Sequence, residues 1–435
     1  MSDIAMPSAK SHDDALAGRI LRLASASVGR LAPRRTHAFW RNMMARFPDE
    51  PAYAVRYVSE LLLTESWTAL DDAAGWAGRY HAPELDLRLV DAALARADVE
   101  QGENRIRQYL GRHGSSSALS MRLYSLHLLQ RDYGGAEAVA VELASLVSAE
   151  KRQAAYLAQR ARFLGQLSSD WSRNGHGQRD FDIHVINLDS DTVRLERVEK
   201  QVHGADYARI AGVKGAQLPE LALKTLTGNQ GSMQKGTVGC FLSHLVAWER
   251  VAAGGRPALV LEDDAWLLAG VPPSVAALNL PEGFDLVFAN ERMSPDSLRY
   301  PKGEIGTIPV GASVRTKTSG WSSVGTDGYF VSPKGAKKLL AMLARDGIAG
   351  DVDWRLLSYA LTESQRARLR AGGFAANAIA FHEGQHTRQH RIRASVLSPA
   401  IIRQFAGGSV RLWDNALPHS HMAAARSLVA LQADT

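Results

Sequence analysis

The sequence predicts an α/β domain built on a mostly parallel central sheet, preceded by an all-α, helical-repeat-like domain. Between residues 36 and 167, apolar positions recur three and four apart and β-branched runs are few, which is typical of packed helices. After residue 180, short β-rich runs alternate with helical segments, which is typical of a parallel sheet. The stretch PALVLEDDAW (257–266) starts with an apolar run suited to a strand buried on both faces.

Composition and charge narrow the classes of protein to consider. The chain has 435 residues, of which 46% are hydrophobic and 22% charged, so a globular protein of two or more domains is expected. A net charge of +6 favours anionic partners. The single Cys240 excludes an internal disulfide and a cysteine-built zinc site, which is compatible with a reducing cytoplasm. We expect neither a membrane span nor a secretory signal, because charges interrupt every long apolar window.

The N-terminal tail, residues 1–35, contains a short amphipathic helix over 16–31. Its apolar face is flanked by the basic residues Arg19, Arg22 and Arg30. Two interpretations stand. The helix lies peripherally on an anionic membrane surface, or it packs on its own domain.

The helical domain, residues 36–167, consists of segments of the length found in α-solenoids. The periodicity predicts helices over 51–64, 66–80, 82–96, 103–112, 116–130, 134–148 and 149–164. No strict repeat period is visible, so the likeness to a tetratricopeptide-like array is loose. Such a domain is either a docking surface for a protein partner or acceptor, or a structural cap on the unit that follows.

A polar stretch, SSDWSRNGHGQR (168–179), predicts a linker, and residues 180–400 then form the α/β domain, with 401–435 as a C-terminal tail. Within the domain we expect a strand over 182–189 followed by a helix over 192–201. Further elements are expected as a helix over 240–252, strands over 258–261 and 284–290, and a strand and helix within 328–343.

Three carboxylates, Glu262, Asp263 and Asp264, follow the central strand directly. Ligands of open α/β sheets bind at the carboxyl ends of the strands, so these acids are placed where a substrate would lie. Carboxylate oxygens suit Mg²⁺ or Mn²⁺, and such a cation can hold a diphosphate. The alternative is a solvated turn that caps the next helix.

Six motifs occur in a fixed order along the α/β domain. They are INLD with a following arginine (186–194), ARIAGVKG (208–215), GCFLSHLVAWE (239–249), LVLEDDA (259–265), FDLVF (284–288) and GYFVSPKGAKKLL (328–340). Together these motifs resemble family 25 glycosyltransferases, a group that includes bacterial lipopolysaccharide and lipooligosaccharide galactosyltransferases. The resemblance covers residues 181–395 and does not extend to the helical domain.

The resemblance implies a GT-A-type fold, a UDP-sugar donor that is commonly UDP-galactose, a divalent cation (Mn²⁺ or Mg²⁺) and inversion at the anomeric carbon. It implies metal ligation by Asp264, assisted by Glu262 or Asp263, with His382 as a late ligand. The expected donor-binding residues are Asn187, Arg194, Ser243, His244, Glu262 and Asp263.

Three of these donor-site residues also have a purely structural interpretation. Arg194 could pair on the surface with Asp191 or Glu196, and Asn187 at a strand end suits a uracil edge or a simple turn. His244 could be a hydrogen-bonded structural residue of its helix.

An inverting transfer needs a base that takes the proton of the acceptor hydroxyl. In GDVDWRLL (350–357), the expected base is Asp353, with Asp351 as the second choice. The alternative is that either residue caps the helix that begins at Trp354.

The predicted reaction therefore moves a hexose from a UDP-sugar to a hydroxyl of a glycan or lipid-linked saccharide acceptor. Lys214 and Thr237 depart from the family pattern and leave the acceptor open. Nucleic acid is not among the expected partners. Because nucleotide sugars are made in the cytoplasm, the enzyme is expected there or at the inner membrane face. The rival interpretations are a non-catalytic docking protein with a relic α/β domain, and a sugar nucleotidyltransferase.

Overall fold

The structure is a computed structural model that describes residues 33–63, 66–146, 151–174, 179–227, 235–293, 305–312, 324–348, 350–370 and 392–404. These residues divide into two compact units, one ending at Leu126 and one beginning at His127. Residues 16–31, predicted to form an amphipathic helix, and the predicted metal ligand His382 lie outside the described residues.

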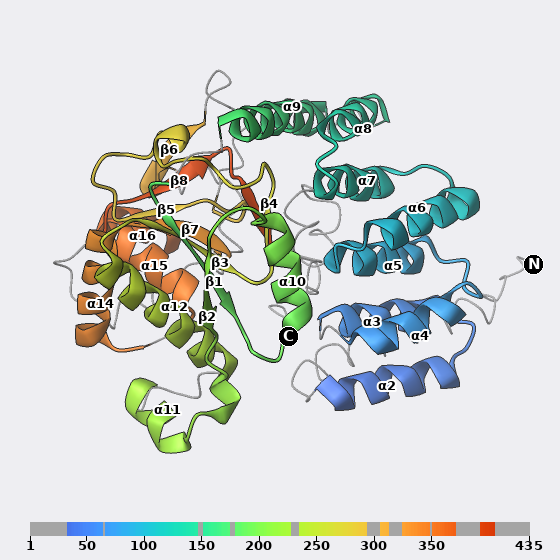
Figure 1. Cartoon of the computed structure of the whole chain (residues 1–435). Helices are drawn as coiled ribbons and strands as arrows, with labels where there is room; N and C mark the ends of the chain where they lie inside the picture. The colour runs from blue at the N-terminus through green and yellow to red at the C-terminus, as the bar shows by residue number, and fades with distance from the viewer. Residues whose placement is uncertain are drawn as a thin grey trace, which may run out of the picture. The chain divides into compact units, whose positions relative to one another are not determined.

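The first unit is all-α, as the periodicity predicts. Its helices are α2 (Pro33–Arg46), α3 (Pro51–Leu63), α4 (Trp67–Ala77), α5 (Pro83–Ala95), α6 (Val99–His113) and the larger part of α7 (Ser117–Leu129). Consecutive helices contact one another from α2 to α6, and aromatic and aliphatic side chains such as Trp40, Tyr53 and Leu61 form their shared core. Figure 1 shows these helices in colours that run from blue at α2 to teal at α7.

A buried arginine and a buried aspartate inside the first unit form an ion pair. Arg122 of α7 donates from Nε and Nη2 to the two oxygens of Asp91 in α5, at 2.8 and 2.9 Å. Both residues are buried. Removing one partner of such a pair would leave a buried charge, so this contact fixes α7 against α5.

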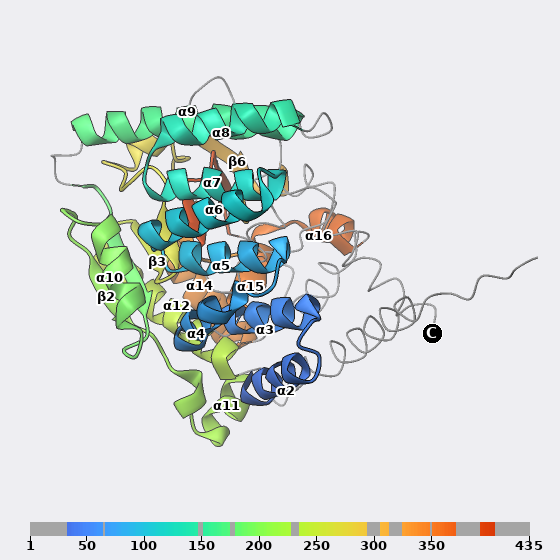
Figure 2. The ribbon, with the colours of Figure 1, turned by 90° about the vertical axis from the view of Figure 1, so that its right-hand side faces the viewer.

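The second unit begins with helices α8 (Tyr133–Leu146) and α9 (Lys151–Asn174), which pack side by side (Figure 2). Gly165 of α9 allows this close approach, since a Cβ there would lie 3.1 Å from the Cβ of Tyr133. The Tyr133 hydroxyl donates to the carbonyl of Leu268 at 2.8 Å, which joins the helix pair to the α/β part of the unit.

A seven-stranded sheet in the order β2-β1-β3-β7-β5-β8-β6 forms the centre of the second unit. Its strands are β1 (Asp182–Asn187), β2 (Ala208–Ala211), β3 (Ala258–Glu262), β5 (Leu286–Phe288), β6 (Gly306–Pro309), β7 (Gly328–Val331) and β8 (Ala394–Ser398). The pairings make β7 and β6 antiparallel to their neighbours, and the other strands share one direction. The predicted mostly parallel sheet of an α/β fold is confirmed.

Helices cover this sheet and a smaller sheet joins it. The described helices are α10 (Thr192–Gln201), α11 (Glu220–Thr227), α12 (Lys235–Gly254), α14 (Pro333–Asp346), α15 (Val352–Ala360) and α16 (Glu363–Arg370). Helix α12 contacts both α14 and α15, and Figure 1 shows these three helices together on one side of the sheet. The second sheet pairs β4 (Ala265–Leu267) with β9 (Ile402–Gln404) in antiparallel register.

Glycines of the sequence motifs lie where two backbones touch. A Cβ on Gly239, at the start of GCFLSHLVAWE, would collide with the carbonyl of Val213 in ARIAGVKG. A Cβ on Gly335, in GYFVSPKGAKKLL, would collide with the backbone of Asp285 in FDLVF. The motifs are therefore joined in pairs by contacts that only glycine permits.

The structure differs from the predicted domain limits at three places. The first unit ends at Leu126 instead of residue 167, because α8 and α9 group with the α/β part. Residues 168–174, expected in the linker, are the end of α9, because Leu167 and Trp171 are buried and continue its apolar face. Residues 402–404, expected in the C-terminal tail, form β9, which pairs with β4 across a long sequence separation. Among the described helices, none combines the length and the apolar character needed to cross a bilayer.

Candidate active site

The candidate site lies at the carboxyl end of β3. Because β1 and β3 are parallel, with Ile186 opposite Glu262, Asn187 and the acids emerge at the same edge of the sheet. The antiparallel strand β7 begins at that edge, so Thr326 and Asp327, which precede it, arrive there too. The topology therefore gathers side chains from three strands.

Glu262 is held from two sides by hydrogen bonds. Nε2 of His244 lies 3.3 Å from its Oε1, and the hydroxyl of Thr326 lies 2.7 Å from the same oxygen. Burial alone would raise the pKa of Glu262, but the bonds from His244 and Thr326 outweigh burial and lower it to about 2. Glu262 is therefore ionised.

His244 belongs to a buried chain of donors and acceptors. The Tyr329 hydroxyl accepts from Nε1 of Trp248 at 2.8 Å and lies 2.9 Å from Nδ1 of His244. The Tyr329 hydroxyl can give its one hydrogen to Nδ1, and Nε2 of His244 then donates to Glu262. His244 thus acts on the site through Glu262.

Asp353 shares the Thr326 hydroxyl with Glu262. Its Oδ1 also lies 2.7 Å from that oxygen. The Thr326 hydroxyl has one hydrogen, which it can donate to Glu262 or to Asp353 but not to both at once, and when it is donated to Asp353 it stabilises the ionised form of that carboxyl. Burial, opposed by Arg292 and reinforced by Glu262, raises the pKa of Asp353 to about 6.

Asp351, the second choice for the base, is exposed at the start of α15. Its side chain makes no capping hydrogen bond, although it occupies the N-cap position. Asp353 lies within the first turn of α15 and points to Thr326 instead of capping the helix. The geometry therefore favours Asp353 over Asp351 as the group that would face a substrate proton.

Arg292 supplies positive charge beside these acids. Its Nε donates to Oδ2 of the fully buried Asp327 at 3.1 Å, and Nη2 pairs with Oδ1 of the same residue. Nη2 also lies 4.0 Å from Oδ2 of Asp353. Arg292 thus offsets the charge of the buried Asp327 and of the partly buried Asp353.

Asp264 retains one carboxylate oxygen with no partner. Its Oδ2 accepts from Nε2 of Gln404 at 2.8 Å, whereas Oδ1 is buried and has no hydrogen bond among the described residues. Burial and the negative charges of Glu262 and Asp327 raise the pKa of Asp264 to about 8. A bare oxygen in a negative surrounding fits a cation, which would supply the missing positive charge.

Asp263, in contrast, is satisfied by the protein. Asn187 donates from Nδ2 to its Oδ2 at 2.9 Å, and Arg194 donates from Nη1 to its Oδ1 at 3.0 Å. Arg194 also pairs with Asp191 at 3.2 Å. Asn187, Arg194 and Asp263 are thus held by contacts with one another at the edge of the site. Contact of these residues with a donor stays a prediction.

Ser243 is placed by similar internal contacts. Its hydroxyl donates to the carbonyl of Gly239 at 2.7 Å and accepts from the backbone N–H of Val213 at 2.8 Å. The residue is buried and fastens the ARIAGVKG loop to α12. A donor-binding role for Ser243 also stays a prediction.

One group of described residues brings three potential metal ligands within 4.8 Å, namely Cys240, His244 and Glu262. Its chemistry does not suit a metal. Although Cys240 keeps an exposed surface, burial of its thiol and the charges of Glu262 and Asp353 raise its pKa well above the ordinary value. The thiol therefore stays protonated, and His244 already bonds to Glu262.

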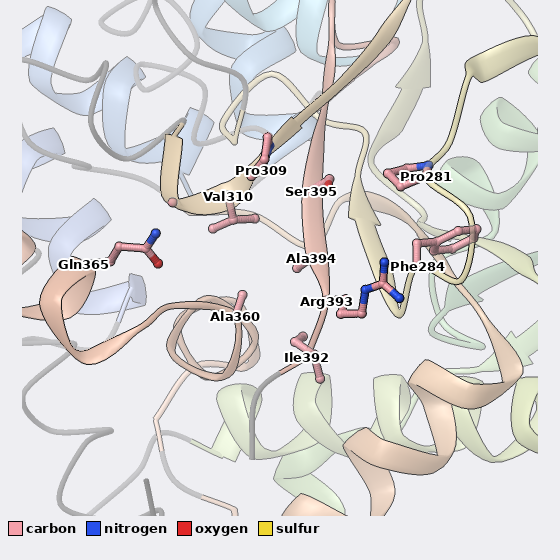
Figure 3. Close-up of a pocket in the computed structure, with 11 residues that line it drawn as sticks. Pro281, Phe284, Pro309, Val310, Ala360, Gln365, Ile392, Arg393, Ala394 and Ser395 are labelled. Atoms are coloured by element: carbon pink, nitrogen blue, oxygen red, sulfur yellow. The ribbon is translucent and has the colours of Figure 1, made fainter. Parts of the chain in front are cut away.

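A cavity of about 220 Å³ lies elsewhere on the sheet, at the amino ends of β5 and β8 (Figure 3). Phe284 and Arg393 lie on one side of it and Val310 and Gln365 on the other. None of the site's carboxylates lines this cavity, so it is separate from the candidate active site.

The structure adds three residues that the sequence did not single out, Arg292, Thr326 and Asp327. Thr326 and Asp327 directly precede the GYFVSPKGAKKLL motif, and this adjacency is the signal that could have identified them. Arg292 has no such signal, since it follows β5 in a segment outside the six motifs.

Comparison with known proteins gives one family. Residues 181–353 match the family described as "Glycosyltransferase family 25 (LPS biosynthesis protein)". The chain is similar to a "Glycosyltransferase 25 family member" of Aedes aegypti, with 32% identity over 179 residues, which cover 36% of this chain and 27% of the relative. A protein of the same description from Anopheles gambiae is 28% identical over 201 residues, which cover 41% of this chain and 31% of the relative.

The similarity covers less than a third of the length of either relative. The family match begins just before β1 and ends at Asp353, so it contains every acid of the candidate site. The helical first unit and the helices α8 and α9 lie outside it. The resemblance predicted from the motifs is confirmed for the C-terminal portion of the chain, where residues 181–353 match the family.

Proposed function

We propose that the chain is a metal-dependent, inverting glycosyltransferase that moves a hexose from a UDP-sugar to a hydroxyl of a glycan or glycoconjugate. The proposal rests on the environments of two acidic residues, Asp353 and Asp264. Asp353 is a partly buried carboxyl with a pKa of about 6, and Asp264 is a buried carboxyl with an unpartnered oxygen among the described residues. A base and a cation ligand at one sheet edge are the two groups that such a transfer requires.

Asp353 would accept the proton of the acceptor hydroxyl as the hydroxyl oxygen forms its bond to the anomeric carbon. The bond between that carbon and the diphosphate oxygen breaks in the same displacement, so the configuration inverts and UDP leaves. Thr326 and Arg292 orient Asp353 before the reaction. A group with a pKa of about 6 is largely ionised at neutral pH and still binds a proton readily.

Asp264 would hold the divalent cation, Mn²⁺ or Mg²⁺, with the predicted ligand His382 as a further candidate. When bound, the cation supplies positive charge to the diphosphate leaving group. Glu262 is less suited to ligation than the sequence suggests, because Oε1 is already engaged by His244 and Thr326. Its role here is to anchor Thr326 between the two carboxyls.

The donor sugar and the acceptor are part of the proposal. Galactose is the first sugar to test because the resemblance implies it most often. A surface-polysaccharide or lipopolysaccharide acceptor fits the description of the matching family, and the helical first unit is a candidate surface for binding it.

A donor panel tests the proposed function. Full-length protein is incubated with UDP-galactose, UDP-glucose or UDP-N-acetylglucosamine, with and without Mn²⁺, and released UDP is measured. Cation-dependent release with one donor, absent in Asp264→Ala, would support the proposal. Lack of release with every donor and metal would instead favour a docking protein with an inactive α/β domain.

A further inference from the structure

Helix α9 lies outside the family-matching region, yet its Arg160 reaches the segment that carries Arg292. Arg160 is 5% exposed and forms an ion pair with Oε1 of Glu291. Arg403 of β9 is also 5% exposed and donates from Nε to Oε2 of Glu291 at 2.7 Å. Each oxygen of one carboxylate therefore receives a guanidinium, one from α9 and one from β9.

Glu291 is one residue away from a contact of the candidate active site. Its neighbour Arg292 pairs with Asp327 and lies 4.0 Å from Asp353. The backbone N–H of Glu291 donates to the carbonyl of Ile402 at 3.0 Å, which fixes the end of β5 against β9. A shift of Glu291 would therefore move the guanidinium that offsets the site's buried acids.

The second arginine on Glu291 is equally close to the site. Gln404, which follows Arg403 in β9, donates to Asp264 at 2.8 Å. The cluster of Arg160, Glu291 and Arg403 thus adjoins both halves of the site, the Asp353 half through Arg292 and the Asp264 half through Gln404.

Charge explains why Arg160 matters to the site. The side chain of Glu291 is only 21% exposed, so the loss of one of its two charged partners is costly and draws on another cation within reach. If Arg160 were replaced by a neutral residue, Oε1 of Glu291 would lose the guanidinium of Arg160, and the adjacent Arg292 would be available to replace it. Arg292 would then leave Asp327 and Asp353 with uncompensated negative charge.

We propose that Arg160 is a positioning residue for the sugar-transfer site, which makes α9 part of the catalytic unit. By occupying Glu291, Arg160 keeps Arg292 directed at Asp327 and Asp353. The inference rests on the proposed function for its catalytic consequence. The attachment of α8 through Tyr133 to Leu268 supports it, because it joins the same helix pair to the α/β part at a second point.

The test compares full-length variants with the donor that the wild type turns over. Arg160→Met should lower kcat by about 10- to 100-fold, the effect of misplacing a catalytic group by about 1 Å, with the KM for the donor nearly unchanged. Arg162→Met is the matched control, since Arg162 is exposed on the same helix, pairs with Glu137, and should keep wild-type kcat. Adding Glu291→Gln to Arg160→Met removes the unpaired charge and should restore kcat to within about threefold of wild type.

Wild-type kcat in Arg160→Met would overturn the inference, and so would a folded double variant that stays as slow as Arg160→Met. If Arg160→Met does not fold, Arg160→Lys takes its place. It keeps the charge and should retain kcat within about threefold, and a loss of tenfold or more in the folded protein would contradict a charge-based role.

Amide hydrogen exchange separates this inference from the proposed function. Should the wild type turn over no donor, the proposed function fails, but Arg160→Met should still speed exchange over residues 289–293 relative to Arg162→Met. Equal exchange in the two variants would overturn the anchoring itself.

Discussion

Replacing Asp353 by Asn should remove the base while keeping its size. We expect kcat to fall by about 10²- to 10⁴-fold, the usual contribution of a positioned general base. The amide of Asn can still bond to the Thr326 hydroxyl, so the packing around α15 should survive. The loss would therefore report proton transfer rather than unfolding.

The structure also gives the pH at which the base works. The pKa of Asp353 rises from 3.8 to about 6, and two pKa units correspond to about 3 kcal/mol between the protonated and ionised forms. The protonated carboxyl cannot accept a proton, so with Mn²⁺ kept saturating at every pH, kcat/KM should rise about tenfold per pH unit below 6 and level off above it. The residual activity of Asp353→Asn should lack this acidic limb.

Stability should change in the opposite sense. Because the folded pKa of Asp353 exceeds the unfolded value, the folded chain binds the proton more tightly, and stability falls as pH rises from about 4 to 6. Asp353→Asn should escape this loss and be at least as resistant to urea at pH 7 as the wild type.

Released UDP, measured between pH 5 and 8, provides the assay, and urea unfolding provides the check of folding. Asp351→Asn is the matched control, because Asp351 is two residues away and exposed, and it should keep near-normal turnover. Turnover of folded Asp353→Asn above about a third of wild type, or an unchanged acidic limb in that variant, would refute the assignment.

Three further outcomes are expected. In thermal unfolding, Mn²⁺ at a hundredfold excess over Kd should stabilise the wild type by about 2.7 kcal/mol and leave the stability of Asp264→Asn unchanged. The affinity of the wild type for Mn²⁺ should weaken below pH 8, where a proton competes for Asp264. Thr326→Val should move the acidic limb of kcat/KM to higher pH by about half to one pH unit, because a hydrogen bond that lowers the pKa of Asp353 is lost. An acidic limb at the wild-type pH would contradict the hydrogen bond between Thr326 and Asp353. Arg122→Met should cost about 3–5 kcal/mol in urea unfolding, whereas Arg107→Met, which breaks an exposed pair, should cost about 1 kcal/mol or less.

Local patterns in the sequence predicted most elements of the structure. The helix expected over 192–201 has those bounds, and the expected strand over 258–261 differs from β3 by one residue. Periodicity and turn residues suffice here because each element satisfies its own backbone hydrogen bonds or packs a regular apolar face. Domain limits were less accurate, since the end of α9 and the pairing of β9 depend on burial against distant residues.

The candidate site was predictable only in part, for the same reason. Glu262, Asp263 and Asp264 were visible because three acids follow one apolar run. Their different environments were not visible. Asp263 is satisfied by Asn187 and Arg194, whereas Asp264 keeps a bare oxygen, and no sequence pattern separates neighbours that face opposite surroundings.

The sequence by itself determined the α/β and all-α character of the two parts, the strand that ends in acids, and the resemblance of residues 181–353 to family 25 glycosyltransferases. Only the tertiary structure decided that Thr326 links Glu262 to Asp353, that Arg292 offsets Asp327, and that Arg160 reaches Glu291 from a helix outside the family region. These contacts join residues 27 to 131 positions apart in the chain. Hydrogen bonds and charge pairs depend on distance in space, which chain order does not specify until the sheet has assembled.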